Sequence, residues 1–385
     1  NTANVAVGLA NTTLLLEGLE DYNNNQADDT NWYFAAKNPG FWSENIKVAV
    51  IDNAADQIIT PTLETGTIAA TKVGFGVTQA LTGVTVGVGT TAAATGILKG
   101  VVTGKTSTTL EVKVVSKVIG GTETLIEYQQ NSQFEFKTGT MLNIVNNSGT
   151  TVGKSSTITS ADWYNSQNIL TSVADGGSDF TTLKWRAVLN KPKTNNYVSK
   201  RDGANDALHV VVIDAGGGVT GDVGSVLEKF ANLSKAKDGV ASGNESVYYK
   251  DFLANNSEYI FSGAHVTNAD DSHHSTLVLP GGITGFTSIT AAEGSWGQDA
   301  KNIKFSSIGN QGYSLTGGLD YTGVGVYNAP LGDILTSYDK FSDPVDSDIR
   351  FLLQGGCSGS KEEEQAKANK LIQLAEGRKD CVAVI

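Results

Sequence analysis

The chain has 385 residues, a length at which two or three domains are expected in place of a single hydrophobic core. Its 44 glycines and its low share of charged residues, 18%, favour many strands and turns and exclude an all-helical fold. The formal net charge of −12 disfavours nucleic acid as a partner, and no stretch approaches the roughly 20 consecutive apolar residues of a membrane-spanning helix.

The N-terminal part of the chain, residues 1–54, alternates between polar and apolar segments. A polar run at 22–30, rich in Asn and Asp, predicts a loop. An aromatic segment at 32–34, an Asn-Pro-Gly turn at 38–40 and the alternating apolar run at 46–50 predict a strand, a turn and a strand.

Residues 55–160 differ in composition from both flanks. Thr, Gly and Val recur there in short alternating runs, such as 109–115 and 134–136, which predict strands joined by hairpin turns. We therefore expect an all-β module that is inserted into the domain formed by its flanks.

The region after the insertion returns to longer apolar runs. Those at 208–213, 258–262 and 275–279 predict three strands. Near the C-terminus, apolar residues recur at helical spacing within the charged segment 361–376, which predicts an amphipathic helix. The residues at this spacing are Ala368, Leu371, Ile372 and Ala375.

Two apolar runs flank this helix, at 349–353 and 381–385. A strand, a helix and a strand in this order predict a βαβ unit with a parallel strand pair. Three consecutive acidic residues, Glu362, Glu363 and Glu364, occupy the first turn of the helix. Their position favours the helix dipole and requires no catalytic explanation.

A glycine-rich run extends from Asp214 to Gly224, directly after the strand at 208–213. The backbone amides of such a loop can bind phosphate. However, no Lys followed by Ser or Thr comes after the last glycine, and residues 226–230 fit a strand as well as a helix. We therefore favour a wide glycine-rich hairpin over a phosphate-binding loop.

A possible metal site is the cluster of His273 and His274 with Asp270 and Asp271. Adjacent residues of a strand point to opposite faces, so two neighbouring imidazoles rarely reach one ion. No further His or Cys lies at ligand spacing, and a solvated loop is the favoured interpretation.

The remaining histidines and the cysteines are expected to be structural. His209 and His265 lie in or beside apolar runs, as hydrogen-bonded core or edge histidines do. Cys357 lies in a glycine-rich corner before the predicted helix, whose dipole would lower a thiol pKa, but no His accompanies it nearby. We expect Cys357 and Cys381 to be buried and reduced, and we expect no catalytic residue, no cofactor and no metal ion.

Five parts of the chain resemble segments of the contractile tail sheath proteins of myoviruses. They are NPGFWSENIKVAV (38–50), LHVVVIDAGGGVTG with VLEKFANLSKAKDGV (208–240), YYKDFLANNSEYIF (248–261), YSLTGGLDY (313–321), and the stretch 348–385 that contains IRFLLQGGCSGS and RKDCVAVI. The motif residues singled out within them are Asn38, Pro39, Gly40, Thr316, Gly317, Gly318, Cys357 and Cys381. The resemblance covers 32–54 and 163–385, whereas the β-rich insertion carries little signal.

This resemblance implies a structural subunit of a phage tail and not an enzyme. Subunits of this family form hexameric rings that stack around the tail tube as an extended helical sheath. Contraction of the sheath drives the tube through the host envelope, so that genome ejection and host entry follow. The implied partners are further copies and the tube, baseplate and neck proteins, without nucleic acid or membrane insertion. The implied location is the virion tail, assembled in the host cytoplasm.

The expected fold is α+β. It consists of a discontinuous, mixed-sheet sheath core at 1–54 and 161–385, with the βαβ unit near its C-terminus, and the inserted β module at 55–160. Both ends of the chain look cut, and the C-terminal assembly domain of the family is expected to lie outside it. Two alternatives remain, a β-rich adhesion protein of a virion or cell surface that binds host glycans, and an enzyme built on the corners at Gly221 and Cys357.

Overall fold

The computed structural model describes most of the chain and divides it into two compact units, Asn1–Gly318 and Leu319–Ile385. The described residues are 5–6, 16, 18–26, 32–38, 40–85, 93–146, 149–170, 183–266, 293–294, 296–318, 331–345, 347–354 and 360–385. Helices and strands both contribute substantially, so the α+β class is confirmed.

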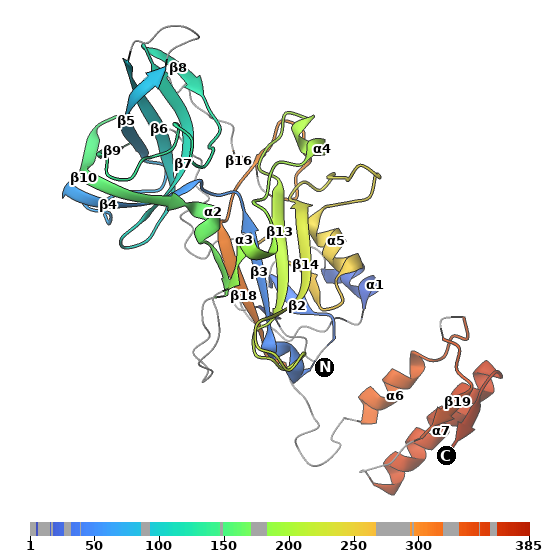
Figure 1. Cartoon of the computed structure of the whole chain (residues 1–385). Coiled ribbons are helices and arrows are strands. Elements are labelled where there is room, and N and C mark those ends of the chain that lie inside the picture. The colour runs from blue at the N-terminus through green and yellow to red at the C-terminus, as the bar shows by residue number, and fades with distance from the viewer. Residues whose placement is uncertain are drawn as a thin grey trace. The chain divides into compact units, whose positions relative to one another are not determined.

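The first unit contains a seven-stranded sheet with the strand order β14-β13-β3-β18-β1-β2-β15 (Figure 1). Its strands are β1 (Val5–Ala6), β2 (Phe34–Ala36), β3 (Ile46–Asp52), β13 (Ala207–Asp214), β14 (Ser225–Ser234), β15 (Ile260–Ser262) and β18 (Asn310–Thr316). Every described pairing in this sheet is antiparallel. The expected strands at 46–50, 208–213 and 258–262 are confirmed, and 275–279 lies outside the described residues.

The central strands are buried on both faces because helices and loops cover each side of the sheet. On one face, Val48 and Val210 pack with Tyr249 and Leu253 of α5 (Tyr249–Asn256). On the other face, alternate residues of β3 and β13 pack with the tryptophans of α2 (Trp163–Ser166) and α3 (Trp185–Val188). Burial on both sides explains why β13 is a nearly continuous apolar run and not an alternating one.

The inserted region folds as a closed six-stranded barrel (Figure 1). Its strands are β4 (Gln57–Thr65), β5 (Gly76–Thr85), β6 (Ala93–Lys105), β7 (Leu110–Ile119), β9 (Leu142–Val145) and β10 (Thr151–Asp162), with β8 (Thr122–Leu125) added along β7. Pairing of β4 with β7 closes the ring. Alternate residues of β7 are buried in a core of its own, as expected for a barrel strand.

The two ends of the barrel lie side by side where it joins the sheet. The N–H of Trp163 donates to the carbonyl oxygen of Asp56 at 2.9 Å, so the chain leaves and returns at one point. The Asp56 carboxylate accepts from Lys191 Nζ at 2.9 Å and from the N–H of Val114 at 3.0 Å. Lys113 Nζ of the barrel donates to the carbonyl oxygen of Asn53 at 2.9 Å. The proposed boundaries 55 and 160 thus fall within a few residues of the barrel strands, and the separability of the module stays a prediction.

Two expectations from the sequence are wrong. The predicted loop at 22–30 begins with a π-helix, η1 (Tyr22–Gln26), because the Tyr22 ring stacks on Phe261 at 4.6 Å and anchors the segment. The predicted strand at 134–136 is a turn, because both backbone polar groups of Phe136 bind the Gln57 side chain in place of a neighbouring strand.

The remaining elements of the first unit are short. They are α1 (Leu19–Asp21), the 3₁₀ helix η2 (Phe41–Asn45), β11 (Asn168–Leu170), β12 (Leu183–Lys184), α4 (Asn196–Ser199), β16 (Glu293–Gly294) and β17 (Lys304–Phe305).

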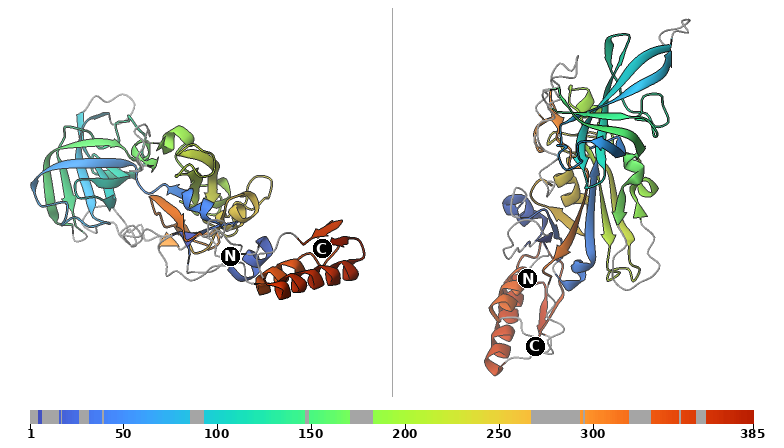
Figure 2. Two further views of the ribbon diagram at one scale, coloured as in Figure 1. Left: turned by 90° about the horizontal axis from the view of Figure 1, so that it is seen from below. Right: turned by 90° about the vertical axis from the view of Figure 1, so that its left-hand side faces the viewer.

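The second unit contains α6 (Leu331–Asp339), β19 (Phe351–Leu353), α7 (Lys361–Arg378) and β20 (Val382–Val384). Strands β19 and β20 pair in parallel, and α7 lies along them (Figure 2), so the predicted βαβ unit is confirmed. Ser360 and Glu363 form a capping box at the start of α7.

The second unit has its own small core, built from Leu352, Leu371 and Leu374. On the opposite face of the strand pair, apolar side chains including Phe351 and Val382 are exposed. The expectation of one mixed sheet is therefore wrong for the described strands: the large sheet of the first unit is antiparallel, and the parallel pair lies in the second unit with a core of its own. The domain bounds 1–54 and 161–385 stay a prediction.

Candidate functional site

Two of the sequence motifs come together at one end of the large sheet. Gly40, with a φ of 147°, precedes η2, and its carbonyl oxygen accepts a hydrogen bond from Ser43 Oγ at 2.8 Å. Gly317, with a φ of 87°, follows β18, and its N–H donates to Glu44 Oε1 at 3.1 Å. This hydrogen bond joins residues 273 positions apart in the sequence. Glycine is required at both turns because other residues rarely adopt a positive φ.

The other motif residues lie beside these turns or apart from them. Asn38 lies in the bend after β2, Thr316 ends β18, and Gly318 follows it. Cys381 lies in the second unit and forms no disulfide, but it is half-buried and not buried as the sequence predicts, because it packs at the margin of the small core around Leu352. Pro39 and Cys357 are outside the described residues, so the expected state of Cys357 stays a prediction.

The glycine-rich run connects β13 to β14 as a hairpin, as the sequence predicts. The N–H groups of Val219 and Thr220 donate to Asp214 Oδ2 at 3.0 and 2.7 Å. A Cβ atom at Gly216 would lie 2.1 Å from Oδ1 of Asn45, so a larger residue at this position would displace the Asn45 side chain. Because two of its amides bind Asp214 and a strand follows it, the phosphate-loop alternative is wrong.

The two described histidines are hydrogen-bonded, as expected. His209 Nε2 donates to the carbonyl oxygen of Asn190 at 2.6 Å, and its Nδ1 accepts from the N–H of Asn232 at 3.0 Å. Burial lowers the pKa of His209, so the ring is neutral near pH 7. His265 Nδ1 lies 2.9 Å from the hydroxyl oxygen of Tyr249.

Neither a metal site nor a membrane-spanning helix is found among the described residues. Among those that the structure describes, no group of three or more His, Cys, Asp or Glu side chains is placed to hold a metal ion. The cluster around His273 and His274, with Asp270 and Asp271, lies outside them. Within the described part of the chain, no helix has the length and apolar character to cross a membrane.

A buried ion pair that no sequence pattern predicts lies in the first unit. Lys235 Nζ lies 2.7 Å from Asp52 Oδ2, and both side chains are 0% exposed. Lys235 also donates to the carbonyl oxygens of Asn205 and Ser306 at 2.9 Å. Asp52 accepts from two backbone N–H groups, those of Ile308 and Gly309, at 2.8 and 2.9 Å. The pair is thus fully hydrogen-bonded, and it joins β3 to segments before β13, after β14 and before β18.

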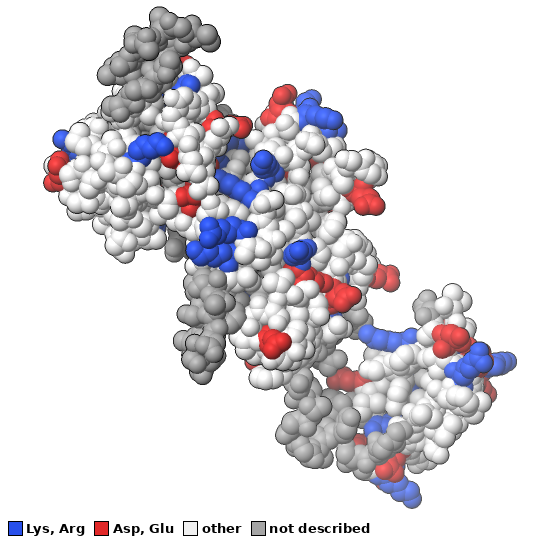
Figure 3. All heavy atoms as spheres, viewed as in Figure 1, with Lys and Arg blue, Asp and Glu red and all other residues white. Residues whose placement is uncertain are grey.

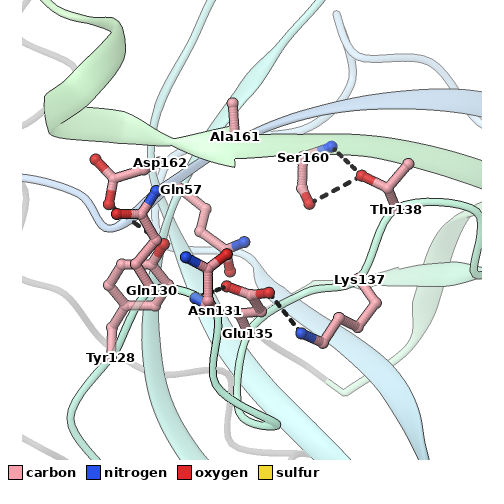
Figure 4. Close-up of a pocket in the computed structure, with 10 residues that line it drawn as sticks. All are labelled: Gln57, Tyr128, Gln130, Asn131, Glu135, Lys137, Thr138, Ser160, Ala161 and Asp162. Carbon is pink, nitrogen blue, oxygen red and sulfur yellow. Dashed lines mark hydrogen bonds and ion pairs between the residues drawn. The ribbon is translucent and has the colours of Figure 1, made fainter.

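A polar pocket of about 340 Å³ opens on the barrel beside β10 (Figure 4). Its lining residues are Gln57, Tyr128, Gln130, Asn131, Glu135, Lys137, Thr138, Ser160, Ala161 and Asp162. The Tyr128 hydroxyl donates to Asp162 Oδ2 at 3.3 Å, and burial and the charge of Asp162 raise the pKa of Tyr128. Glu135 accepts from the N–H of Asn131 and from Lys137 Nζ.

This pocket offers hydrogen-bond donors and acceptors to a polar ligand. The raised pKa keeps Tyr128 neutral at physiological pH. Because its one hydroxyl proton is donated to Asp162, the hydroxyl oxygen is left to accept a hydrogen bond from a ligand. The side-chain amide of Asn131 has no partner among the described residues. Sequence reasoning missed the pocket because its walls come from β4, β10 and the irregular segment 126–140, which no short motif joins.

A second pocket, of about 690 Å³, lies in the first unit beside His209. Its lining residues are Leu189, Asn190, Lys191, Lys193, Thr194, Asn195, Asn196, His209, Ala231 and Asn232. Side-chain amides and two lysines predominate in this set, and Asp and Glu are absent from it. The pocket therefore favours an anionic or hydrogen-bonding group.

No protein-family model matches the chain, and no curated protein matches it.

Proposed function

We propose that this chain is a structural subunit of a bacteriophage contractile tail sheath. In this function it polymerises around the tail tube and contracts to drive the tube through the host envelope. Its partners are further copies of itself and the tube, baseplate and neck proteins. It acts in the virion tail after assembly in the host cytoplasm, without a cofactor and without catalysis.

One observation carries this proposal. The segments that resemble sheath proteins at 38–50, 208–240 and 313–318 are far apart in the sequence, yet they supply β3, β13, β14 and β18, four consecutive strands of one sheet. The described strands of the barrel, which carries little of the resemblance, pair only among themselves. A set of unrelated chance similarities would have no reason to meet in one sheet around one interruption.

The large sheet also has the rigidity that the proposed function requires. A contracting lattice works when its subunits exchange one set of contacts for another as packed bodies. In this sheet, strands β3 and β13 are covered on both faces, and the fully hydrogen-bonded pair of Lys235 and Asp52 joins four segments. A domain packed in this way moves as a rigid unit and does not deform when its neighbours shift.

Electron microscopy of the complete gene product, expressed alone and negatively stained, tests the proposal. Sheath subunits are expected to form tubes or stacked rings with a regular axial repeat. Discrete particles at every protein and salt concentration would contradict it.

The polar pocket of the barrel supports a second candidate, a surface protein that binds host glycans. Neutral sugars bind through many hydrogen bonds, and this pocket offers the Tyr128 hydroxyl, the Asn131 amide and the Glu135 carboxylate. A glycan array probed with the chain distinguishes the two candidates. Specific binding that Asn131→Ala and Glu135→Gln abolish, together with the absence of polymers, would favour adhesion.

A further inference from the structure

In one segment of this acidic chain, every charged residue is a Lys or an Arg. Residues 183–201 contain six Lys and Arg residues and no Asp or Glu. They contribute +6 to a net charge of −12, so the rest of the chain carries −12 − 6 = −18. The basic residues of this segment, called the basic strip below, are Lys184, Arg186, Lys191, Lys193, Lys200 and Arg201.

Buried apolar residues between the cations fix the basic strip to the first unit. Trp185 and Val198 are 0% exposed, and Pro192 between them is buried. The indole N–H of Trp185 donates to Asn310 Oδ1 of β18 at 2.8 Å. Figure 3 shows Lys and Arg side chains gathered over α3 and α4 and along the chain between them. The strip is therefore a fixed surface and not a loose charged loop.

Most of these charges have no carboxylate partner. Lys191 pairs with Asp56 at 2.9 Å. Arg201 lies over the ring of Tyr197, at 3.5 Å from its centroid. Lys184, Arg186, Lys193 and Lys200 form no ion pair with any residue that the structure describes. Unpaired like charges on one surface repel one another, and an anionic partner relieves that repulsion.

The middle of the strip is hollowed by the pocket beside His209. Lys193 is exposed at its edge, and the exposed side chain of Asn196 offers an amide donor. Ammonium and amide donors around a hollow suit a carboxylate side chain that enters it. The pocket thus gives the strip a shape as well as a charge.

We propose that the basic strip is a contact surface for the acidic surface of a second copy of this chain. The choice of partner rests on the proposed function, and it is favoured by the charge distribution, because each copy carries −18 outside its own strip. Nucleic acid is disfavoured, because the same −18 would repel phosphates close to the strip.

The two surfaces in this contact are different parts of the subunit. A contact between different surfaces is heterologous, and repeated heterologous contacts generate rings or helical assemblies. The strip would thus let subunits of like net charge associate in one orientation. Exposed ion pairs are individually weak and are screened by salt, so the contact supplies orientation more than affinity.

Charge reversal tests this inference. The strip variant carries Lys184→Glu, Arg186→Glu and Lys193→Glu, and the matched control carries Lys72→Glu, Lys154→Glu and Lys361→Glu elsewhere. Each set changes the net charge by −6, so general repulsion is equal in both. Circular dichroism and a denaturation midpoint establish that both variants fold.

Sedimentation velocity at about 50 mM and about 500 mM NaCl measures self-association. We expect association of the unmodified chain at low salt that weakens at high salt. The strip variant should associate at least about tenfold more weakly, whereas the control should differ much less. Equal association of both variants, or no association of the unmodified chain, would overturn the inference.

A labelled strip variant mixed with the unmodified chain tests the heterologous character of the contact. It still presents an acidic surface, so it should sediment with the unmodified chain at low salt. Fluorescence anisotropy with a DNA oligonucleotide tests the competing partner, and strip-dependent DNA binding without self-association would also overturn the inference.

The outcome is separable from that of the proposed function. Tubes formed equally by the complete gene product with and without the strip substitutions would refute the strip contact and leave the sheath assignment standing. Strip-dependent self-association of the chain, without ordered polymers of the complete product, would support the strip contact and refute the sheath assignment.

Discussion

The sheet and the barrel of the first unit are stabilised in different ways. Apart from the hairpin of β13 and β14, most neighbouring strands of the sheet are far apart in the sequence, as in the pairing of Val5 with Thr316, and a buried ion pair joins its segments. The barrel uses strands from one continuous stretch, 57–162, around an apolar core of its own. The sheet therefore depends on long-range polar contacts, whereas the barrel depends on local strand pairing.

The largest expected effect comes from Lys235→Met, which leaves the charge of Asp52 buried without its partner. We expect a loss of roughly 3–5 kcal/mol in the free energy of unfolding of the sheet. All five tryptophans lie outside 57–162, so their fluorescence reports on the sheet alone, whereas far-UV circular dichroism reports on both parts. Urea titration should show an early fluorescence transition while the barrel signal persists.

The matched control for this variant is Lys237→Met, two residues away and exposed. It should change stability by less than about 0.5 kcal/mol. Equal effects of the two substitutions, or a simultaneous loss of both signals, would show that the ion pair is not what distinguishes the sheet.

Gln57→Ala should destabilise the barrel by roughly 2 kcal/mol. The Gln57 amide is 2% exposed, donates to the carbonyl oxygen of Phe136 at 3.1 Å and accepts from its N–H at 2.8 Å. Its removal leaves the buried N–H of Phe136 unpaired, whereas the carbonyl oxygen of Phe136 keeps the hydrogen bond from Ser160 Oγ at 2.7 Å. The measurement is a thermal melt followed by circular dichroism. Tryptophan fluorescence should keep the unmodified midpoint, and a shift of that midpoint would contradict the local character of the barrel.

Excision of the barrel should cost the sheet less. In the variant, two glycines replace residues 57–161, so that Asp162 is retained as the cap of α2. The sheet loses the contacts of Asp56 with Val114 and of Lys113 with Asn53, roughly 1–2 kcal/mol in all. The remainder should unfold cooperatively in urea, and a chain without a cooperative transition would refute the separability of the module.

The smallest effect concerns pH. His209 is neutral in the fold and its pKa is lowered by burial, so the unfolded chain binds a proton more readily. The stability due to this residue is complete above about pH 6.5, the pKa of an unperturbed His, and falls as the pH decreases below it. The urea midpoint of His209→Gln should therefore change less between pH 7.5 and pH 5.5 than that of the unmodified chain. The measurement is the urea midpoint of both proteins across this pH range. Parallel profiles would contradict this.

The sequence predicted features that local pattern determines. The helix at 361–378 follows from apolar spacing and an acidic first turn, and β13 follows from an apolar run that only His209 interrupts. The hairpin after Asp214 follows from its glycines and from the missing Lys of a phosphate loop. The satisfied state of His209 was also expected, because it lies inside an apolar strand.

Features that depend on distant contacts could not be predicted in this way. Closure of the barrel requires three residue pairs between β4 and β7, and no local pattern encodes them. Phe136 alternates with polar neighbours as a strand residue would, yet its backbone N–H and carbonyl oxygen form hydrogen bonds with the side chain of Gln57 and not with a neighbouring strand. Lys235 resembles the exposed Lys237 in the sequence, and only the fold shows that it is buried. The sequence shows the basic strip as a charge pattern, but only the structure shows that burial of Trp185 fixes its conformation.

The hydrogen bond between Trp163 and Asp56 has a consequence for how such a protein can vary. Because the chain departs from the sheet and returns to it at adjacent positions, the register of β3 and β13 is independent of what lies between them. Any domain with neighbouring termini fits this position, including a fluorescent protein or an affinity tag. In related chains we therefore expect the sheet to stay constant while this position carries domains of different size and fold, or none.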